Sequence, residues 1–152
     1  CSSDLAAGAD VATTASYQAS YEGFARRGLS VEQATACLQL SVQLAREARD
    51  AFWAANPQLH GVRPRPLVAA SVGPFGAMRA DGSEYVGHYG VDDATLRDFH
   101  RPRLAALLAA GPLEIVARRR NSTSSAARRR ASALPFHRIA RCWCASGKNW
   151  HG

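Results

Sequence analysis

Apolar residues recur at helical spacing between residues 30 and 55. They fall three or four positions apart, which gathers them on one helix face, at Ala34, Leu38, Val42, Ala45, Ala48 and Phe52. Ser30, with Gln33 three residues later, matches a capping box, in which each side chain satisfies a free backbone N–H of the other residue. Pro57 stops the pattern, so we predict a helix over 30–55.

A second helical pattern follows Asp92 and ends before Gly111. Its apolar members are Leu96, Phe99, Leu104, Leu107 and Leu108. We predict a helix over 92–110. Pro102 lies inside it and is expected to bend or unpair one turn, because proline has no backbone N–H to donate.

Three short segments indicate strands, at 10–16, 67–72 and 113–117. The middle one is a continuous apolar run, as in parallel strands that are buried on both faces. Strands that alternate with helices predict consecutive right-handed crossovers, with the strands parallel and adjacent and both helices on one side of the sheet. The fold class is therefore α/β, as a barrel or an open sheet.

Polar residues follow the first two predicted strands, where a buried core should continue. Ser16, Tyr17 and Gln18 leave the first strand, and Ser71 and Gly73 end the second. In parallel α/β folds, the loops at the carboxyl ends of the strands form the ligand face. These residues either bind a ligand there or only make turns and helix caps, and the pattern leaves both interpretations open.

Composition indicates a globular chain, since 47% of the 152 residues are hydrophobic. No run of apolar residues is long enough to span a membrane and no secretory leader is visible, so we expect a cytoplasmic protein without a membrane partner. The four cysteines are too few and too unevenly placed for a disulfide framework and are interpreted as reduced thiols. Cys37, next to the apolar stripe of the first helix, is expected to be a small buried hydrophobe.

Charge divides the chain into two regions. Residues 1–117 hold 10 Arg and 12 acidic residues, whereas residues 118–152 hold 8 Arg, one Lys and no acidic residue. We therefore predict a folded domain over 1–117 and an irregular, Arg-rich tail over 118–152, either disordered or foreign to the domain.

Four segments resemble, in order and spacing, the homocysteine S-methyltransferase family. They are "AGADVATTASYQASYEGFARRG" (7–28), "LVAASVGPFGA" (67–77), "DGSEY" (81–85) and "FHRPRLAALLAAG" (99–111). The resemblance implies a (β/α)8 TIM barrel, of which this chain holds about three β-α units. It also implies methyl transfer from a sulfonium donor, S-methylmethionine or S-adenosylmethionine, to the thiol of homocysteine, which gives methionine.

The resemblance also implies site residues and a cofactor. By match to the strand-end motifs, the substrate-binding residues are Thr14, Ser16, Tyr17, Gln18, Ser71 and Gly73. The family binds zinc through cysteine thiolates, and zinc deprotonates a bound thiol while leaving it nucleophilic. Tyr17 could also offer its ring to a cationic donor.

The chain departs from the family in ways that predict an inactive fragment. It is much shorter than family members, it lacks their first strand with its acidic ligand, and Arg118 aligns where the family has a substrate-binding glutamate. The paired zinc cysteines have no counterpart in matching context. We therefore assign no catalytic and no metal-binding residue, and expect the chain alone to lack methyltransferase activity.

The tail leaves three interpretations open. It could be a foreign or out-of-register end on a truncated barrel. It could make the chain a noncatalytic basic protein that binds nucleic acid or anionic surfaces, which is the alternative to the methyltransferase function. It could also form a small zinc site from His137, Cys142, Cys144 and His151, although Cys-x-Cys is not the usual Cys-x2-Cys spacing.

Overall fold

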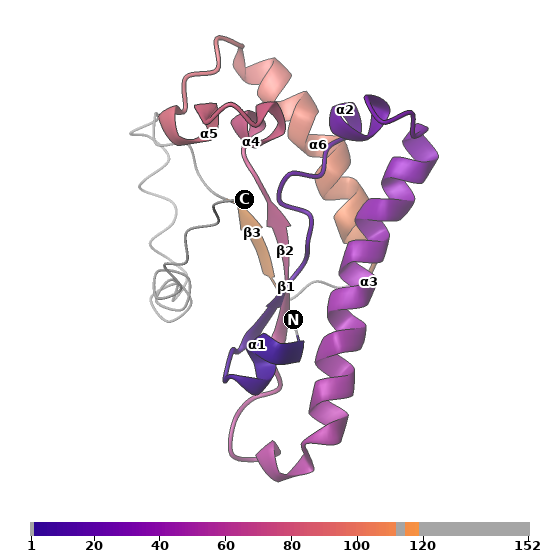
Figure 1. Ribbon diagram of the computed structural model, residues 1–152, viewed down its shortest axis with the longest axis vertical. Coiled ribbons are helices and arrows are strands. Elements are labelled where there is room, and N and C mark those ends of the chain that lie inside the picture. The colour runs from indigo at the N-terminus through magenta and orange to yellow at the C-terminus, as the bar shows by residue number, and fades with distance from the viewer. Residues whose placement is uncertain (1, 112–114, 119–152) are drawn as a thin grey trace. The chain divides into compact units, whose positions relative to one another are not determined.

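The described residues form a mixed α/β structure around a parallel sheet. The computed structural model describes residues 2–111 and 115–118. Its strands are β1 (Val11–Thr13), β2 (Leu67–Val72) and β3 (Ile115–Arg118), ordered β1-β2-β3 with both pairs parallel (Figure 1). The predicted tail, with its proposed zinc ligands, lies outside the described residues apart from the backbone of Arg118.

The long helices agree with the apolar patterns. α3 (Val31–Ala55) begins with the predicted capping box, in which Gln33 N donates to Ser30 Oγ at 3.3 Å and Ser30 N donates to Gln33 Oε1 at 2.8 Å. α6 (Asp93–Ala109) continues through Pro102. Both helix predictions are confirmed to within one or two residues.

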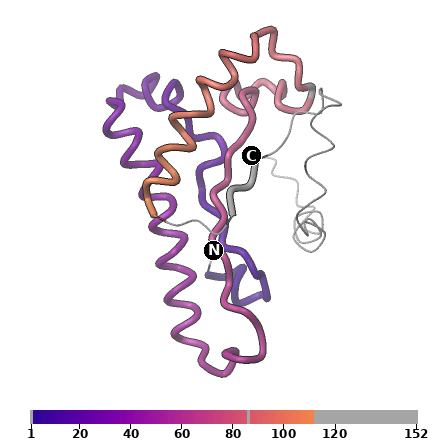
Figure 2. Tube along the Cα trace, turned by 180° about the vertical axis from the view of Figure 1, so that it is seen from behind, coloured from indigo at the N-terminus to yellow at the C-terminus, as the bar shows by residue number. Residues whose placement is uncertain are grey.

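α3 and α6 cover the same face of the sheet, as predicted. One core cluster joins them to β2 through Leu38, Val42, Ala70, Val72, Ala106 and Leu107. Figures 1 and 2 show both helices on the same side of the strands from opposite directions. A second cluster, at the start of the sheet, joins Leu5 of α1 (Ser2–Ala6) to Ala12, Ala45 and Val68.

β1 is shorter than the predicted strand over 10–16. The regular strand ends at Thr13, although Thr14 N still donates to Ala69 O at 3.0 Å. The next β2 amide, Ser71 N, donates to the Thr14 side-chain oxygen at 2.9 Å. A hydroxyl therefore replaces a backbone carbonyl in the ladder, and the chain turns away after this point.

Short helices surround the carboxyl ends of the strands. α2 (Tyr21–Ala25) follows β1, while α4 (Phe75–Arg79) and α5 (Ser83–Val86) follow β2. Figure 1 shows all three at the end toward which the strand arrows point. The 3-10 helix η1 (Pro57–Leu59) lies at the far end of α3.

Cys37 is exposed, so the prediction that it is buried was wrong. The buried stripe of α3 passes through Ala34 and Leu38. Because successive residues of a helix are rotated by about 100°, a neighbour of Leu38 in sequence points away from that stripe. Leu40 and Leu44 are also exposed on α3, at 48% and 55%.

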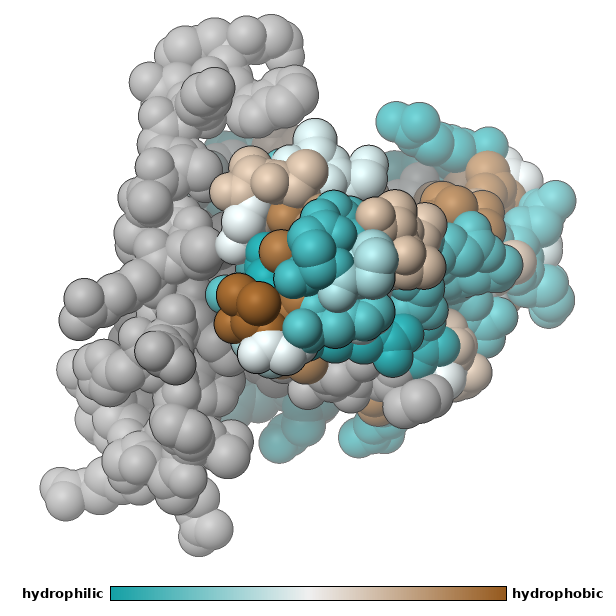
Figure 3. Space-filling model, turned by 90° about the horizontal axis from the view of Figure 1, so that it is seen from below, coloured by the Kyte–Doolittle hydropathy of each residue, from teal (hydrophilic) through white to brown (hydrophobic). Residues whose placement is uncertain are grey.

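The described residues contain no helix that is both long enough and apolar enough to cross a membrane. The view from below Figure 1 shows a surface that is mostly hydrophilic, with hydrophobic residues in small separate patches (Figure 3).

Candidate functional site

Three hydroxyl-bearing residues join the ends of β1 and β2. Ser16 Oγ donates to Ser71 O at 2.7 Å, Ser71 N donates to Thr14 Oγ1 at 2.9 Å, and Thr14 Oγ1 lies 2.6 Å from Ser16 Oγ. Ser16 uses its only hydroxyl proton on the Ser71 carbonyl, so Thr14 must be the donor to Ser16. Both hydroxyl protons are therefore committed within the protein, and both side chains are buried.

The loops that follow these strands also touch. Gly73 N donates to Tyr17 O at 3.0 Å, and a Cβ on Gly73 would collide with that same carbonyl oxygen. Only glycine allows this approach of the two backbones. Residue 73 therefore fixes the separation of the two loops.

Arg103 of α6 holds both loops from the side. Its Nη1 donates to Gly73 O at 3.1 Å and its Nη2 donates to Tyr17 O at 3.2 Å, and the residue is only 2% exposed. The guanidinium also lies over the Phe99 ring, 4.7 Å from its centroid. Burial lowers the pKa of Arg103 to about 10, with Glu22 opposing the shift, so the side chain remains a cation at neutral pH.

Arg103 was not predicted as a site residue, although the sequence carries a signal for it. Arg103 lies four residues after Phe99 and four before Leu107, on the apolar stripe of the predicted helix. A charged residue at a core position requires buried partners. Here those partners are the carbonyls of the two strand-end loops.

Five of the six predicted substrate-binding residues lie together in this arrangement. They are Thr14, Ser16, Tyr17, Ser71 and Gly73. The sixth, Gln18, is exposed on the same loop. Ser20 has a structural role, because its side chain caps α2 by accepting from Gly23 N at 3.0 Å.

The loop over residues 80–90 packs against α4 beside this site. A Cβ on Gly76 would lie 2.5 Å from Glu84 N and 2.6 Å from Tyr89 Cε1, so the loop lies directly on the helix backbone. Phe75 contacts Tyr89 and Phe99, with ring centroids 5.6 and 4.9 Å apart. The aromatic rings thus connect this loop to the helix that carries Arg103.

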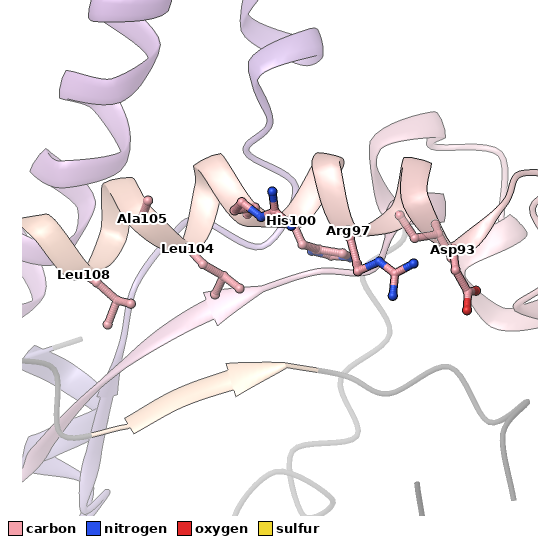
Figure 4. A pocket seen from close by; sticks show the side chains of 8 residues that line it. Asp93, Arg97, His100, Leu104, Ala105 and Leu108 are labelled. Carbon is pink, nitrogen blue, oxygen red and sulfur yellow. The ribbon is translucent and has the colours of Figure 1, made fainter. Parts of the chain in front are cut away.

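A separate hollow lies along α6. Its described lining comes from that helix alone: Asp93, Leu96, Arg97, His100, Arg101, Leu104, Ala105 and Leu108 (Figure 4). None of the six predicted substrate-binding residues belongs to it. Leu108 is 54% exposed there, which indicates an incompletely covered helix face rather than a shaped ligand site.

The described residues do not supply the ligands for a zinc ion. Over residues 2–111 and 115–118, no group of three or more His, Cys, Asp or Glu side chains could hold a metal. Cys37, the free cysteine of this region, is exposed on α3. The strand-end site instead holds backbone groups, hydroxyl oxygens and one buried cation, Arg103, which already donates to two loop carbonyls.

Comparisons with known proteins agree with the motifs. A family model described as homocysteine S-methyltransferase matches residues 4–119. Homocysteine S-methyltransferase YbgG of Bacillus subtilis is 55% identical over 107 residues, and homocysteine S-methyltransferase 1 of Arabidopsis thaliana is 55% identical over 111 residues. These alignments cover 70% and 71% of this chain and 34% of each relative.

A solved structure has the same local fold. The metallated form of the homocysteine methyltransferase MmuM from Escherichia coli is 51% identical, with a TM-score of 0.68 over 75% of this chain and 38% of that one. This chain spans about a third of the length of the curated relatives it matches. With a family match over most of its described residues, the chain belongs to the homocysteine S-methyltransferase family.

Proposed function

We propose that this chain is part of a homocysteine-binding (β/α)8 barrel, in an enzyme that transfers a methyl group from a sulfonium donor to homocysteine. The observation that carries the proposal is the joined carboxyl end of β1 and β2. There, five of the predicted substrate-binding residues and Arg103 form one hydrogen-bonded site.

The arrangement of elements supports a barrel. Consecutive parallel strands with α3 and α6 on one face match a section of barrel wall. Within the described residues, β1 and β3 each have a second edge without a partner strand, where a closed barrel would continue. Both long helices expose a leucine, Leu44 on α3 and Leu108 on α6. In a complete barrel, neighbouring helices would cover such apolar side chains.

The proposed roles divide the site in two. Thr14, Ser16 and Arg103 position the loops, because the two hydroxyl groups and both Nη atoms of the guanidinium already donate within the protein. Tyr17, Gln18 and the backbone around Ser71 and Gly73 are left to contact homocysteine. Such contacts contribute to catalysis by alignment. They hold the thiol of homocysteine in line with the methyl group of S-methylmethionine or S-adenosylmethionine.

The metal is proposed for the whole enzyme and not for this part of it. The similar structure from E. coli is a metallated form, which supports metal use by the whole enzyme. The described residues of this chain do not fit a zinc ion, so we assign none of them to zinc.

A graft protein tests the function. We define the graft as the E. coli homocysteine methyltransferase carrying residues 7–111 of this chain in place of its matching segment. We expect it to form methionine from homocysteine and S-methylmethionine well above a no-protein control. A folded graft without turnover would contradict the proposed function.

The 152-residue chain alone is the second arm of this experiment. It should form no methionine with the same substrates and zinc, because less than half of a barrel cannot align two reactants. Zinc-dependent turnover by the chain, lost on replacing Cys142 and Cys144 with Ser, would show that the tail is a working metal site instead.

A further inference from the structure

Met78, the only methionine of the chain, receives a hydrogen bond from a cation. Arg26 Nη2 donates to Met78 Sδ at 3.4 Å, and the contact lies at the exposed surface. A thioether sulfur is a weak acceptor of hydrogen bonds. The contact therefore places a strong donor directly on the one atom of the methionine side chain that is readily oxidised.

This contact joins the two segments that leave the strand-end site. Arg26 is the C-cap of α2, which follows the loop after β1, and Met78 lies in α4, which follows the loop after β2. Figure 1 shows both helices at the carboxyl ends of the strands. The two loops already meet where Gly73 N donates to Tyr17 O. Arg26 and Met78 connect the same two segments a second time, further along the chain from each strand.

α2 is held by few contacts, so its position is sensitive to each of them. It has five residues, and none of them is buried. Within the described part of the chain, its other side-chain hydrogen bonds are the Ser20 cap and the bond between the Tyr21 and Thr35 hydroxyl groups, at 2.9 Å. α4 is better anchored, with two of its five residues buried. A stronger bond from Arg26 to Met78 would therefore fasten α2 to a firmly placed neighbour.

The sulfur of Met78 is open to oxidation by a hydroperoxide, because the residue is only half-buried and its contact with Arg26 is at the surface. In this reaction a lone pair of the sulfur attacks the terminal peroxide oxygen. The O–O bond breaks, and the leaving oxygen takes up a proton to become water or an alcohol. The sulfur loses two electrons, which the peroxide gains, and the product is methionine sulfoxide.

Oxidation would strengthen the bond from Arg26. The sulfoxide group is polar, and its oxygen accepts hydrogen bonds far better than a thioether sulfur does. A guanidinium N–H that donates to this oxygen makes a charge-assisted bond. A sulfoxide disrupts packing in an apolar core, whereas here a cationic donor is already in contact with the sulfur.

We propose that Met78 is an oxidation site whose sulfoxide fastens α2 to α4 through Arg26. The oxidant is a hydroperoxide, and sulfoxide reductases reverse the modification. The oxidised side chain restrains the segment that follows the Tyr17 loop. This inference goes beyond the proposed function and does not depend on methyltransferase activity.

Hydrogen exchange of the 152-residue chain, before and after treatment with hydrogen peroxide, tests the proposal. The peroxide dose is one that fully oxidises free methionine, and dithiothreitol then reduces disulfides while leaving the sulfoxide in place. Peptide mass spectrometry should find one added oxygen on Met78. We expect the amides of residues 21–29 to exchange about tenfold more slowly in the oxidised chain, as for one strengthened charge-assisted hydrogen bond. Methionine sulfoxide reductases should restore the original rates.

Variants assign the effect to this contact. Met78→Leu cannot form the sulfoxide, so peroxide should leave its exchange unchanged. Met78→Gln supplies an amide oxygen as acceptor and should slow exchange without peroxide. Arg26→Leu should remove the effect of oxidation. Arg27→Leu is the matched control and should retain it, because Arg27 carries the same charge, is exposed and is not the donor to Met78.

Four results would each overturn the proposal. The first is the absence of added oxygen on Met78, and the second is unchanged or faster exchange of residues 21–29 after oxidation. The third is a slowing in Met78→Leu equal to that of the unchanged chain, which would assign the effect to another oxidised residue. The fourth is an equal slowing in Arg26→Leu and Arg27→Leu, which would exclude the bond from Arg26.

Discussion

A single guanidinium, that of Arg103, ties the loop after β1 to the loop after β2. Burying a charge is costly unless hydrogen bonds compensate for the lost water. Here two carbonyl oxygens and the Phe99 ring provide that compensation. The position of the Tyr17 and Gly73 backbones therefore depends on a residue from α6, far away in the sequence.

Replacing Arg103 should weaken substrate binding more than it changes the chemical step. In the graft, Arg103→Met removes the buried donor to the Gly73 carbonyl, which costs about 1–3 kcal/mol, while the Tyr17 carbonyl keeps the bond from Gly73 N. We expect KM for homocysteine to rise about tenfold or more, with kcat affected less. Arg101→Met is the control, because the Arg101 side chain is 74% exposed. Steady-state kinetics showing equal KM values for both variants would exclude the positioning role.

The strand-end residues were predictable one by one, and their connections were not. The polar residues that follow the predicted apolar strands placed Ser16 and Ser71 at one edge of a sheet. The two bonds to β2, from Ser16 Oγ to Ser71 O and from Ser71 N to Thr14 Oγ1, depend on the strand register, which no local sequence pattern contains. Cys37 shows the opposite error, because its neighbour Leu38 is buried while Cys37 itself faces outward.

At the level of elements, α2 depends on its cap. It has five residues and no buried residue of its own, and Ser20 Oγ accepts from Gly23 N at its start. So short a helix has little intrinsic stability. The cap therefore contributes to the placement of the segment that follows the Tyr17 loop.

Removing this cap should lower stability measurably. For Ser20→Ala in the graft, we expect the free energy of unfolding in urea to fall by about 1 kcal/mol, the usual value of a serine N-cap. Ser41→Ala is the matched control, since the Ser41 hydroxyl only returns to the Leu38 carbonyl within α3. An equal or larger loss in Ser41→Ala would show that the capping bond is not the stabilising contact.

Long and short elements differ in how well the sequence predicts them. The apolar stripes of α3 and α6 repeat over several turns, so both helices were predicted closely. α4 and α5 were not predicted, because four- and five-residue helices depend on local backbone geometry such as the left-handed Gly82 and Gly87. β1 was predicted too long, because a pattern of small residues cannot show that the Thr14 side chain, and not its backbone carbonyl, accepts the next hydrogen bond from β2.

For the whole molecule, we expect homocysteine to bind at the strand-end site and not in the hollow along α6. The two regions share no predicted substrate-binding residue. The two regions contain different backbone amides. A ligand bound at the strand ends would therefore slow exchange of other amides than a ligand bound in the hollow.

Hydrogen exchange of the graft with and without homocysteine distinguishes binding at these two regions. We predict that homocysteine slows exchange in peptides covering residues 14–20 and 71–77 and leaves residues 93–98 unchanged. Protection confined to residues 93–98, or no protection at the ends of β1 and β2, would contradict homocysteine binding at the strand-end site.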